Sequence, residues 1–159
     1  MTQNPADRQE QRLRRRFRWA AGWLLIQAGA HLPQHWRLFL HPDGPPGAQR
    51  SMVEALQAMP VRAPGASSLW DVLGALSLGY ALLLALLGTA MWILSREAPA
   101  DALRRHAWRN TWLSSLGLAA LLAWHPLPQP LLAFGGAALL FLLAAVTPHP
   151  RPGEAALRG

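Results

Sequence analysis

The chain has 159 residues, of which 52% are hydrophobic and only 14% are charged, and it contains no cysteine. Soluble domains usually carry about 25% charged residues, so the composition argues against a soluble globular protein. The lack of cysteine excludes disulfide scaffolds, thiol–disulfide exchange and thiolate-ligated metal centres. All 15 basic residues are arginines, and the net charge is +7.

The N-terminal region combines a basic segment with an apolar one. Residues 1–18 are polar and rich in arginine, and we expect a cytoplasmic tail. Residues 19–36 are apolar enough for a first membrane span, which Pro33 disturbs near its end. A cleaved secretory signal with Ala28-Gly29-Ala30 as its cleavage site is the alternative. The uncleaved span is favoured because later spans supply packing partners.

The second predicted span follows a long outer loop, residues 37–69, which is rich in proline and glycine at both ends. The middle of this loop, Ser51–Met59, has apolar residues at helical spacing and predicts a short surface helix. Residues 70–94 then form the second span. Ser68 and Asp71 fit the capping-box pattern that marks a helix start.

Two further spans come from the stretch between Arg109 and Arg151, which contains no charged residue. A surface helix needs a polar face, and the stretch is long enough to cross a bilayer twice. Prolines near its middle interrupt the helix, so we place the third span at 110–125 and the fourth at 131–147. Residues 148–159 form a second cytoplasmic tail.

The arginines segregate by side of the membrane on this topology. The outer loop carries only Arg37, Arg50 and Arg62, and every other arginine lies in a tail or in the loop before the third span. Cytoplasmic loops are enriched in basic residues. The sequence therefore predicts an all-α fold: a four-span transmembrane antiparallel helix bundle in a bacterial inner membrane, with both termini cytoplasmic and residues 19–147 as its membrane domain.

Small residues recur at three- and four-residue steps on the later spans and predict close helix packing. They are Gly74, Ser77, Ala81, Ala85 and Gly88 in the second span, Ser114, Gly117, Ala120 and Ala123 in the third, and Gly135 to Ala138 in the fourth. A homodimer face is the alternative interpretation. Trp23 lies deep in the first span and is predicted to pack, whereas the other tryptophans fall near span ends, as in an interfacial belt.

Three polar residues fall at the outer rim of three different predicted spans: His31, Asp71 and His125. Histidine beside a carboxylate can hold a proton or orient a quinone head group, and two histidines can ligate haem or a metal. The structural interpretation, which we favour, makes Asp71 a helix cap and the histidines interfacial residues. His31 and His35 are four residues apart, but Pro33 argues against a regular helical pair.

Gln27, near the middle of the first span, is a further candidate ligand-binding residue. We expect it to act mainly as a structural contact with a neighbouring span. Its predicted hydrogen-bond partners are Ser77, Tyr80 or Ser114.

The run Arg14-Arg15-Arg16 could attract anionic lipid, although a role as topology anchor explains it equally. Nucleic-acid binding is disfavoured because the basic residues follow the sidedness of the membrane. The chain has no Gly-rich phosphate loop, no G-x-S-x-G and no H-E-x-x-H motif. We therefore predict no catalytic residue, no metal ligand and no cofactor.

Short motifs in the first half of the chain resemble those of a known family. They are Gly29-Ala30-His31, Ala58-Met59 in the Pro-rich outer loop, Leu69-Trp70-Asp71 running into Gly74 and Gly79-Tyr80, and Trp92. Together they resemble an uncharacterised bacterial family of small four-helix integral membrane proteins that is distantly similar to DoxX-like proteins. The resemblance covers roughly residues 20–146 and implies a fold and a location, but no activity.

The functional expectation is a non-enzymatic accessory or structural subunit of the membrane. Its expected partners are membrane lipids and either a membrane protein or a second copy of the chain. The alternative is a redox-accessory module that binds a quinone, haem or lipid through the histidine and aspartate residues of the outer rim.

Overall fold

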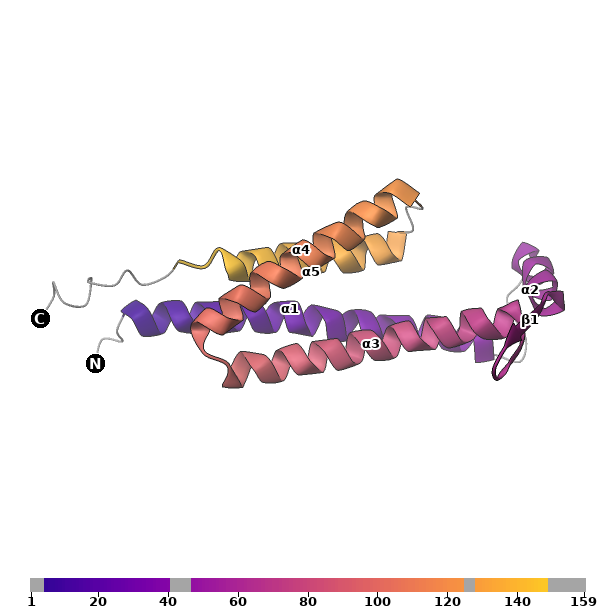
Figure 1. Cartoon of the computed structure of the whole chain (residues 1–159), viewed down its shortest axis with the longest axis horizontal. Helices are drawn as coiled ribbons and strands as arrows, with labels where there is room; N and C mark the ends of the chain where they lie inside the picture. Colours follow the sequence, from indigo (N-terminus) through magenta and orange to yellow (C-terminus); the bar gives the residue numbers. More distant parts are fainter. Residues whose placement is uncertain (1–4, 41–46, 125–127, 149–159) are drawn as a thin grey trace, which may run out of the picture. The chain divides into compact units, whose positions relative to one another are not determined.

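The computed structural model describes residues 5–40, 47–124 and 128–148, which are mostly helical, as predicted (Figure 1). The elements are α1 (Pro5–His35), the π-helix η1 (Trp36–Leu40), α2 (Ala48–Ala58), β1 (Pro60–Ala63), β2 (Ala66–Ser68), α3 (Leu69–Glu97), α4 (Ala100–Trp124) and α5 (Pro128–Ala145). The chain divides into two compact units, described separately below. Unit 1 comprises Met1–Leu24 and Leu87–Gly159, and unit 2 comprises Leu25–Leu86.

Helix α1 begins well before the predicted first span, inside the segment expected to be a polar tail. A proline suits the first helical position because its missing N–H would have no partner there. Leu13 and Phe17 are fully buried and continue into a buried face at Ala20 and Leu24. The few apolar residues of the basic segment thus share one helical face, and packing of that face extends the helix to Pro5.

The structure corrects the expected effect of Pro33, because α1 continues through this residue to His35. The proline removes the donor that would pair with the carbonyl of Gly29. The wider π-helical turn Trp36–Leu40 follows directly, as expected where the regular hydrogen-bond pattern is interrupted.

Residues 37–69, the predicted outer loop, contain the predicted short helix, α2, and also a two-stranded hairpin that was not predicted. Strand β1 pairs antiparallel with β2, with Pro60 opposite Ser68 and Ala63 opposite Ala66. Gly65 in the turn has φ 77°, a conformation that favours glycine. The strands were not predicted because they are short and have prolines in and around them, which disfavour a strand.

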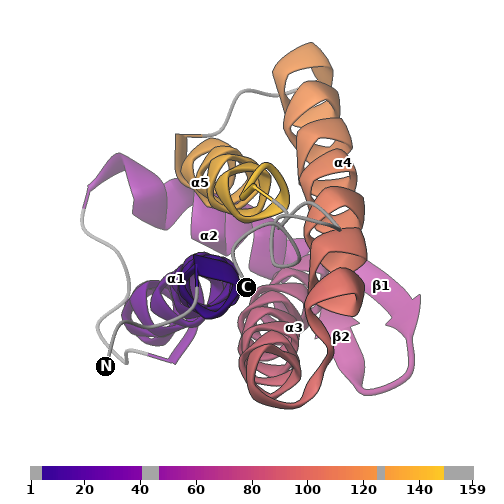
Figure 2. The same cartoon turned by 90° about the vertical axis from the view of Figure 1, so that its left-hand side faces the viewer.

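In unit 1, α4 and α5 lie side by side (Figure 2). A Cβ added to Gly117 would lie 2.6 Å from the Phe134 ring, and one added to Gly136 would lie 2.5 Å from the Trp23 ring. The predicted close packing is confirmed at these two glycines, and the predicted packing role of Trp23 is confirmed too. The predicted close packing does not extend to Ala120 and Ala123, which are exposed.

Two arginines of the basic run bond to the ends of other helices in unit 1. Arg14 donates to the carbonyls of Ser95 (2.9 Å), Arg96 (3.3 Å) and Ala98 (3.0 Å). Arg16 donates to the carbonyl of Leu143 at 2.9 Å and to Thr147 Oγ1 at 3.2 Å. The last carbonyls of a helix have no intrahelical donor. These side chains therefore cap the C-terminal ends of α3 and α5.

Two helices of the described part, α3 and α5, are long and apolar enough to cross a membrane. Helix α3 contains the second predicted span (70–94), and α5 covers all of the fourth (131–147) except its last two residues. The first predicted span (19–36) falls mainly in α1 and the third (110–125) mainly in α4, and neither helix meets the same criterion of length and composition. The prediction of four spans is thus confirmed only as far as an all-α protein with two such helices.

Candidate functional site

The candidate site in unit 2 is a histidine–serine cluster made of His31, His35 and Ser77. The two histidines are one helical turn apart on α1 and therefore share a face. His31 Nε2 lies 2.9 Å from Ser77 Oγ, and His35 Nδ1 lies 3.1 Å from the same oxygen. A hydroxyl has one proton and two lone pairs. Ser77 can therefore donate to one imidazole and accept an N–H from the other.

Aromatic rings surround the histidine–serine cluster. Tyr80 meets the His31 ring edge-on, with centroids 5.2 Å apart, and Phe39 stacks on His35 at 5.0 Å. Phe39 also packs against the buried Trp70 at 4.5 Å. His35 is only 6% exposed. The hydrogen bonds to Ser77 thus lie beside apolar rings, which strengthens them relative to bonds in water.

Sequence analysis identified His31 but undervalued its pairing with His35. The two histidines are one turn apart in the sequence, but Pro33 between them was expected to disturb the helix. Because α1 is helical through the proline, both imidazoles reach the same hydroxyl. Ser77 was singled out as a small packing residue and as a partner for Gln27, and its role between the histidines was missed.

Asp71 is a helix cap, in agreement with the structural interpretation of its sequence position. Its Oδ2 accepts hydrogen bonds of 2.9–3.0 Å from the backbone N–H and hydroxyl groups of both Ser67 and Ser68. The Asp71 N–H donates to Ser68 Oγ at 3.3 Å, which completes the predicted capping box. The carboxylate is engaged by these serines and not by His31.

The other two candidate residues do not join the cluster. His125 lies outside the described residues. Gln27 is partly exposed on α1, and within the described ranges its side chain has no hydrogen-bond partner. The predicted contact with Ser77 is absent, since that hydroxyl already serves two imidazoles.

The histidine–serine cluster can hold a proton or a polar group. Its imidazoles and hydroxyl all donate and accept hydrogen bonds, and a shared hydroxyl provides a route for a proton between the two rings. Across the residues that the structure describes, no group of three or more His, Cys, Asp or Glu side chains could hold a metal ion.

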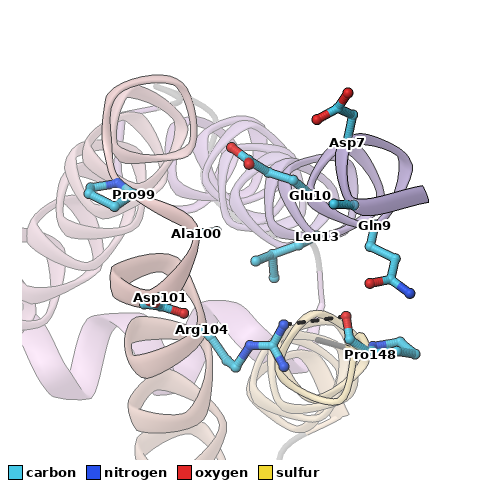
Figure 3. Close-up of a pocket in the computed structure, with 10 residues that line it drawn as sticks. Asp7, Gln9, Glu10, Leu13, Pro99, Ala100, Asp101, Arg104 and Pro148 are labelled. Carbon is cyan, nitrogen blue, oxygen red and sulfur yellow. Dashed lines mark hydrogen bonds between the residues drawn. The ribbon is translucent and has the colours of Figure 1, made fainter. Parts of the chain in front are cut away.

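A second candidate is a recess of ≈ 200 Å³ in unit 1, between the first residues of α1 and of α4 (Figure 3). Arg104 reaches across it and donates to the carbonyl of Pro148 at 3.5 Å. Arg104 Nε and Gln9 Oε1 are buried and have no hydrogen-bond partner among the residues that the structure describes. The volume is below the roughly 300–1,000 Å³ of small-molecule sites. Sequence analysis missed this recess because Gln9 belonged to the expected tail.

Comparisons with protein-family models, with curated proteins and with solved structures find no match for this chain. The resemblance to small DoxX-like membrane proteins stays a prediction.

Proposed function

We propose that the protein is a small multi-pass protein of a bacterial inner membrane, with a non-enzymatic accessory or structural role. The observation that carries the proposal is the exposed apolar surface of α3 and α5. Only 17% of the apolar stretch of α3 and 28% of that of α5 is buried, whereas a core helix of a soluble protein would be mostly buried. Apolar surface on this scale calls for cover by lipid or by a partner.

The contacts of unit 1 support a cytoplasmic N-terminus and C-terminus. Phe17 packs edge-on against Phe141, and the Trp23 indole N–H donates to the carbonyl of Ala133. Helix α1 therefore runs antiparallel to α5. Its arginines before Phe17 lie toward the C-terminal end of α5, the side on which Arg14 also caps α3. A basic end beside an apolar helix is the arrangement typical of a cytoplasmic surface.

The accessory role is supported by the helices' outward-facing leucines. Long stretches of α3 and α4 present them, including Leu82, Leu83 and Leu86 on α3 and Leu113 and Leu116 on α4. Such faces can pack against lipid, a membrane protein or a second copy of the chain. The resemblance to small four-helix membrane proteins agrees with this proposal.

Reporter fusions test the topology. A reporter active only in the cytoplasm should be active after residue 98 and after residue 159, and inactive in the outer loop at residue 55. A reporter active only outside the cytoplasm should give the reverse pattern. Opposite locations for residues 98 and 159 would overturn the four-span arrangement, and extraction of the protein by alkaline carbonate would overturn membrane integration itself.

A second candidate function is the binding of a quinone, haem or lipid head group at the histidine–serine cluster. It is favoured by one observation, the convergence of two imidazole nitrogens on the Ser77 hydroxyl. If it is correct, His31→Gln and His35→Gln should each lose a bound ubiquinone analogue or a haem absorption band in detergent while the protein stays folded. Binding that is unchanged in both variants, or absent from the wild type, would refute it.

A further inference from the structure

Helix α1 carries a line of exposed basic side chains that make no ion pair with the described part of the chain. Arg8, Arg12 and Arg15 are exposed, and Trp19, one turn further on, is 68% exposed. Steps of four, three and four residues place these four side chains along one face of a helix with 3.6 residues per turn. We call Arg8, Arg12, Arg15 and Trp19 the basic stripe.

The basic stripe lies opposite the face of α1 that packs in unit 1. Leu13 and Phe17 are buried on that packed face. The neighbouring Arg14 and Arg16 turn to helix ends, and Arg14 also pairs with Glu10 at 2.7 Å. The three arginines of the stripe have no ion pair within the described part of the chain. Their charge is therefore available to an outside anion.

The position of the basic stripe relative to the end of the apolar helix α5 indicates the kind of anion that it binds. Arg16 bonds to Leu143 and Thr147 at the C-terminal end of α5, so Arg8, Arg12 and Arg15 lie at or beyond the end of that apolar helix. Arg8 and Arg15 are about 10 Å apart along the helix axis. This length is close to one Debye length, the range over which a charged membrane surface attracts basic residues.

We propose that the basic stripe binds the head groups of anionic phospholipids in the cytoplasmic leaflet, with Trp19 at the boundary between head groups and acyl chains. Guanidinium groups donate paired hydrogen bonds to phosphate oxygens, and tryptophan favours the membrane interface. The inference rests on the membrane location proposed above. It adds a lipid class and a binding surface.

Helix α4 shows the same order of side chains, which supports the position of this boundary in unit 1. Arg105 and Arg109 are exposed near its start, and Trp108 and Trp112 are exposed beside and after them. Exposed leucines follow from Leu113 onward. A change from arginine to tryptophan to leucine along one outer face matches the change from head group to hydrocarbon.

The test uses the full chain in a neutral detergent, titrated with phosphatidylglycerol or with phosphatidylcholine of the same acyl chains and followed by native mass spectrometry. We expect the wild type to prefer phosphatidylglycerol. The triple variant Arg8→Gln, Arg12→Gln, Arg15→Gln should bind it on the order of 100-fold more weakly, since each basic residue near an anionic surface contributes roughly a factor of five. Phosphatidylcholine binding should not change.

A matched control removes the same number of charges elsewhere: Arg37→Gln, Arg50→Gln, Arg62→Gln in unit 2. It should keep the wild-type preference, and helical circular dichroism should be the same for all three proteins. Equal losses in both triple variants would overturn the proposal, because the effect would then follow net charge. Full displacement of the lipid by an equal concentration of glycerol phosphate would overturn it as well, since the site would then take a soluble anion.

Carbonate extraction separates this inference from the proposed function. A wild type that stays in the membrane but shows no preference for phosphatidylglycerol refutes only the proposed lipid binding by the basic stripe. A wild type that is extracted into the soluble fraction refutes both.

Discussion

The two units hold their helices together with different polar chemistry. In unit 1, charged guanidinium groups of Arg14 and Arg16 bond to backbone carbonyls at the ends of α3 and α5. In unit 2, two imidazoles share the hydroxyl of Ser77 within the apolar part of α3. The charged contacts occur where helices end, and the contacts of the cluster occur between helix sides.

The difference follows from the cost of moving polar groups out of water. A permanently charged guanidinium is expensive to place in an apolar layer, but at a helix end it can stay partly hydrated and meet unpaired carbonyls. Imidazole and hydroxyl groups can be uncharged and can satisfy each other, so they are tolerated between apolar helix faces. The effects of substitutions on stability should therefore differ between the two units, both in size and in their dependence on pH.

The largest effect is expected where unit 1 packs most closely. Gly136→Ala should lower the free energy of unfolding by about 2 kcal/mol, because its methyl group would lie 2.5 Å from the Trp23 ring. In unit 2, the methyl group added by Gly74→Ala would lie 3.1 Å from the Phe39 ring. This variant should lose less stability, since the gain in helix propensity offsets the crowding. Gly79→Ala, with no atom within 4 Å of the added group, is the control and should be neutral or stabilising. Denaturant unfolding in detergent micelles measures the change in the free energy of unfolding for all three variants. Equal changes would contradict the expected difference between the two units.

Arg14→Gln tests the charged contacts of unit 1. The variant loses hydrogen bonds to three carbonyls and should be destabilised by about 2 kcal/mol. Arg15→Gln removes the same charge from the next residue, which is exposed, and should change stability by less than about 0.5 kcal/mol. Thermal melting of the two variants side by side checks this, and similar melting temperatures would show that only net charge matters.

Ser77→Ala tests the uncharged contacts of unit 2. Loss of the hydroxyl leaves two imidazole nitrogens without this partner, and we expect a cost of about 1 kcal/mol. Ser114→Ala in α4 is the matched control, with an expected change near zero. Nitrogen NMR of labelled histidine would also report altered tautomer populations for His31 and His35 in Ser77→Ala. Unchanged spectra would argue against the shared hydroxyl.

The smallest effect is a dependence on pH at His106, near the start of α4. Partial burial, and then the charges of Arg109 and Arg105, lower the pKa of His106 from 6.5. Arg109 also donates a hydrogen bond to His106 Nδ1 at 2.9 Å, which requires the neutral ring. The unfolded chain binds the proton more readily, so this contribution to stability is complete above pH 6.5 and is lost as the pH falls below it.

Arg109→Gln should raise the pKa of His106 toward its ordinary value and weaken this pH dependence. Arg96→Gln removes the same charge from the end of α3 and serves as the control. Proton NMR titration of the imidazole measures the shift directly. An identical titration in wild type and Arg109→Gln would exclude the proposed influence of the neighbouring arginine.

Local sequence rules predicted those parts of the fold that depend on neighbouring residues. The capping box at Ser68 and Asp71 and the short helix predicted at Ser51–Met59 depend on spacing along one segment, and the structure contains both, the helix as α2. The hairpin after α2 was missed because its strands are short. The helical N-terminal segment was missed because its buried positions, Leu13 and Phe17, are isolated among arginines, and Phe17 packs against Phe141 of α5, far away in the chain.

The candidate site was predicted only in part for the same reason. His31 was found because a polar residue at the end of an apolar stretch is conspicuous. Its partners could not be found, because the contact of His35 with Ser77 joins residues that are 42 apart in the chain. Asp71 was expected to meet a histidine or to cap a helix, and the local cap prevails because the two serines are fixed next to it in sequence.

The amino-acid sequence by itself determined that this chain is helical and that α3 and α5 are apolar enough for a membrane. Both properties follow from composition and spacing within single segments. The tertiary structure alone decided which arginines are internal caps and which remain exposed, and which hydroxyl joins the two imidazoles. Those outcomes depend on the rotation of one helix against another, and no single segment encodes that rotation.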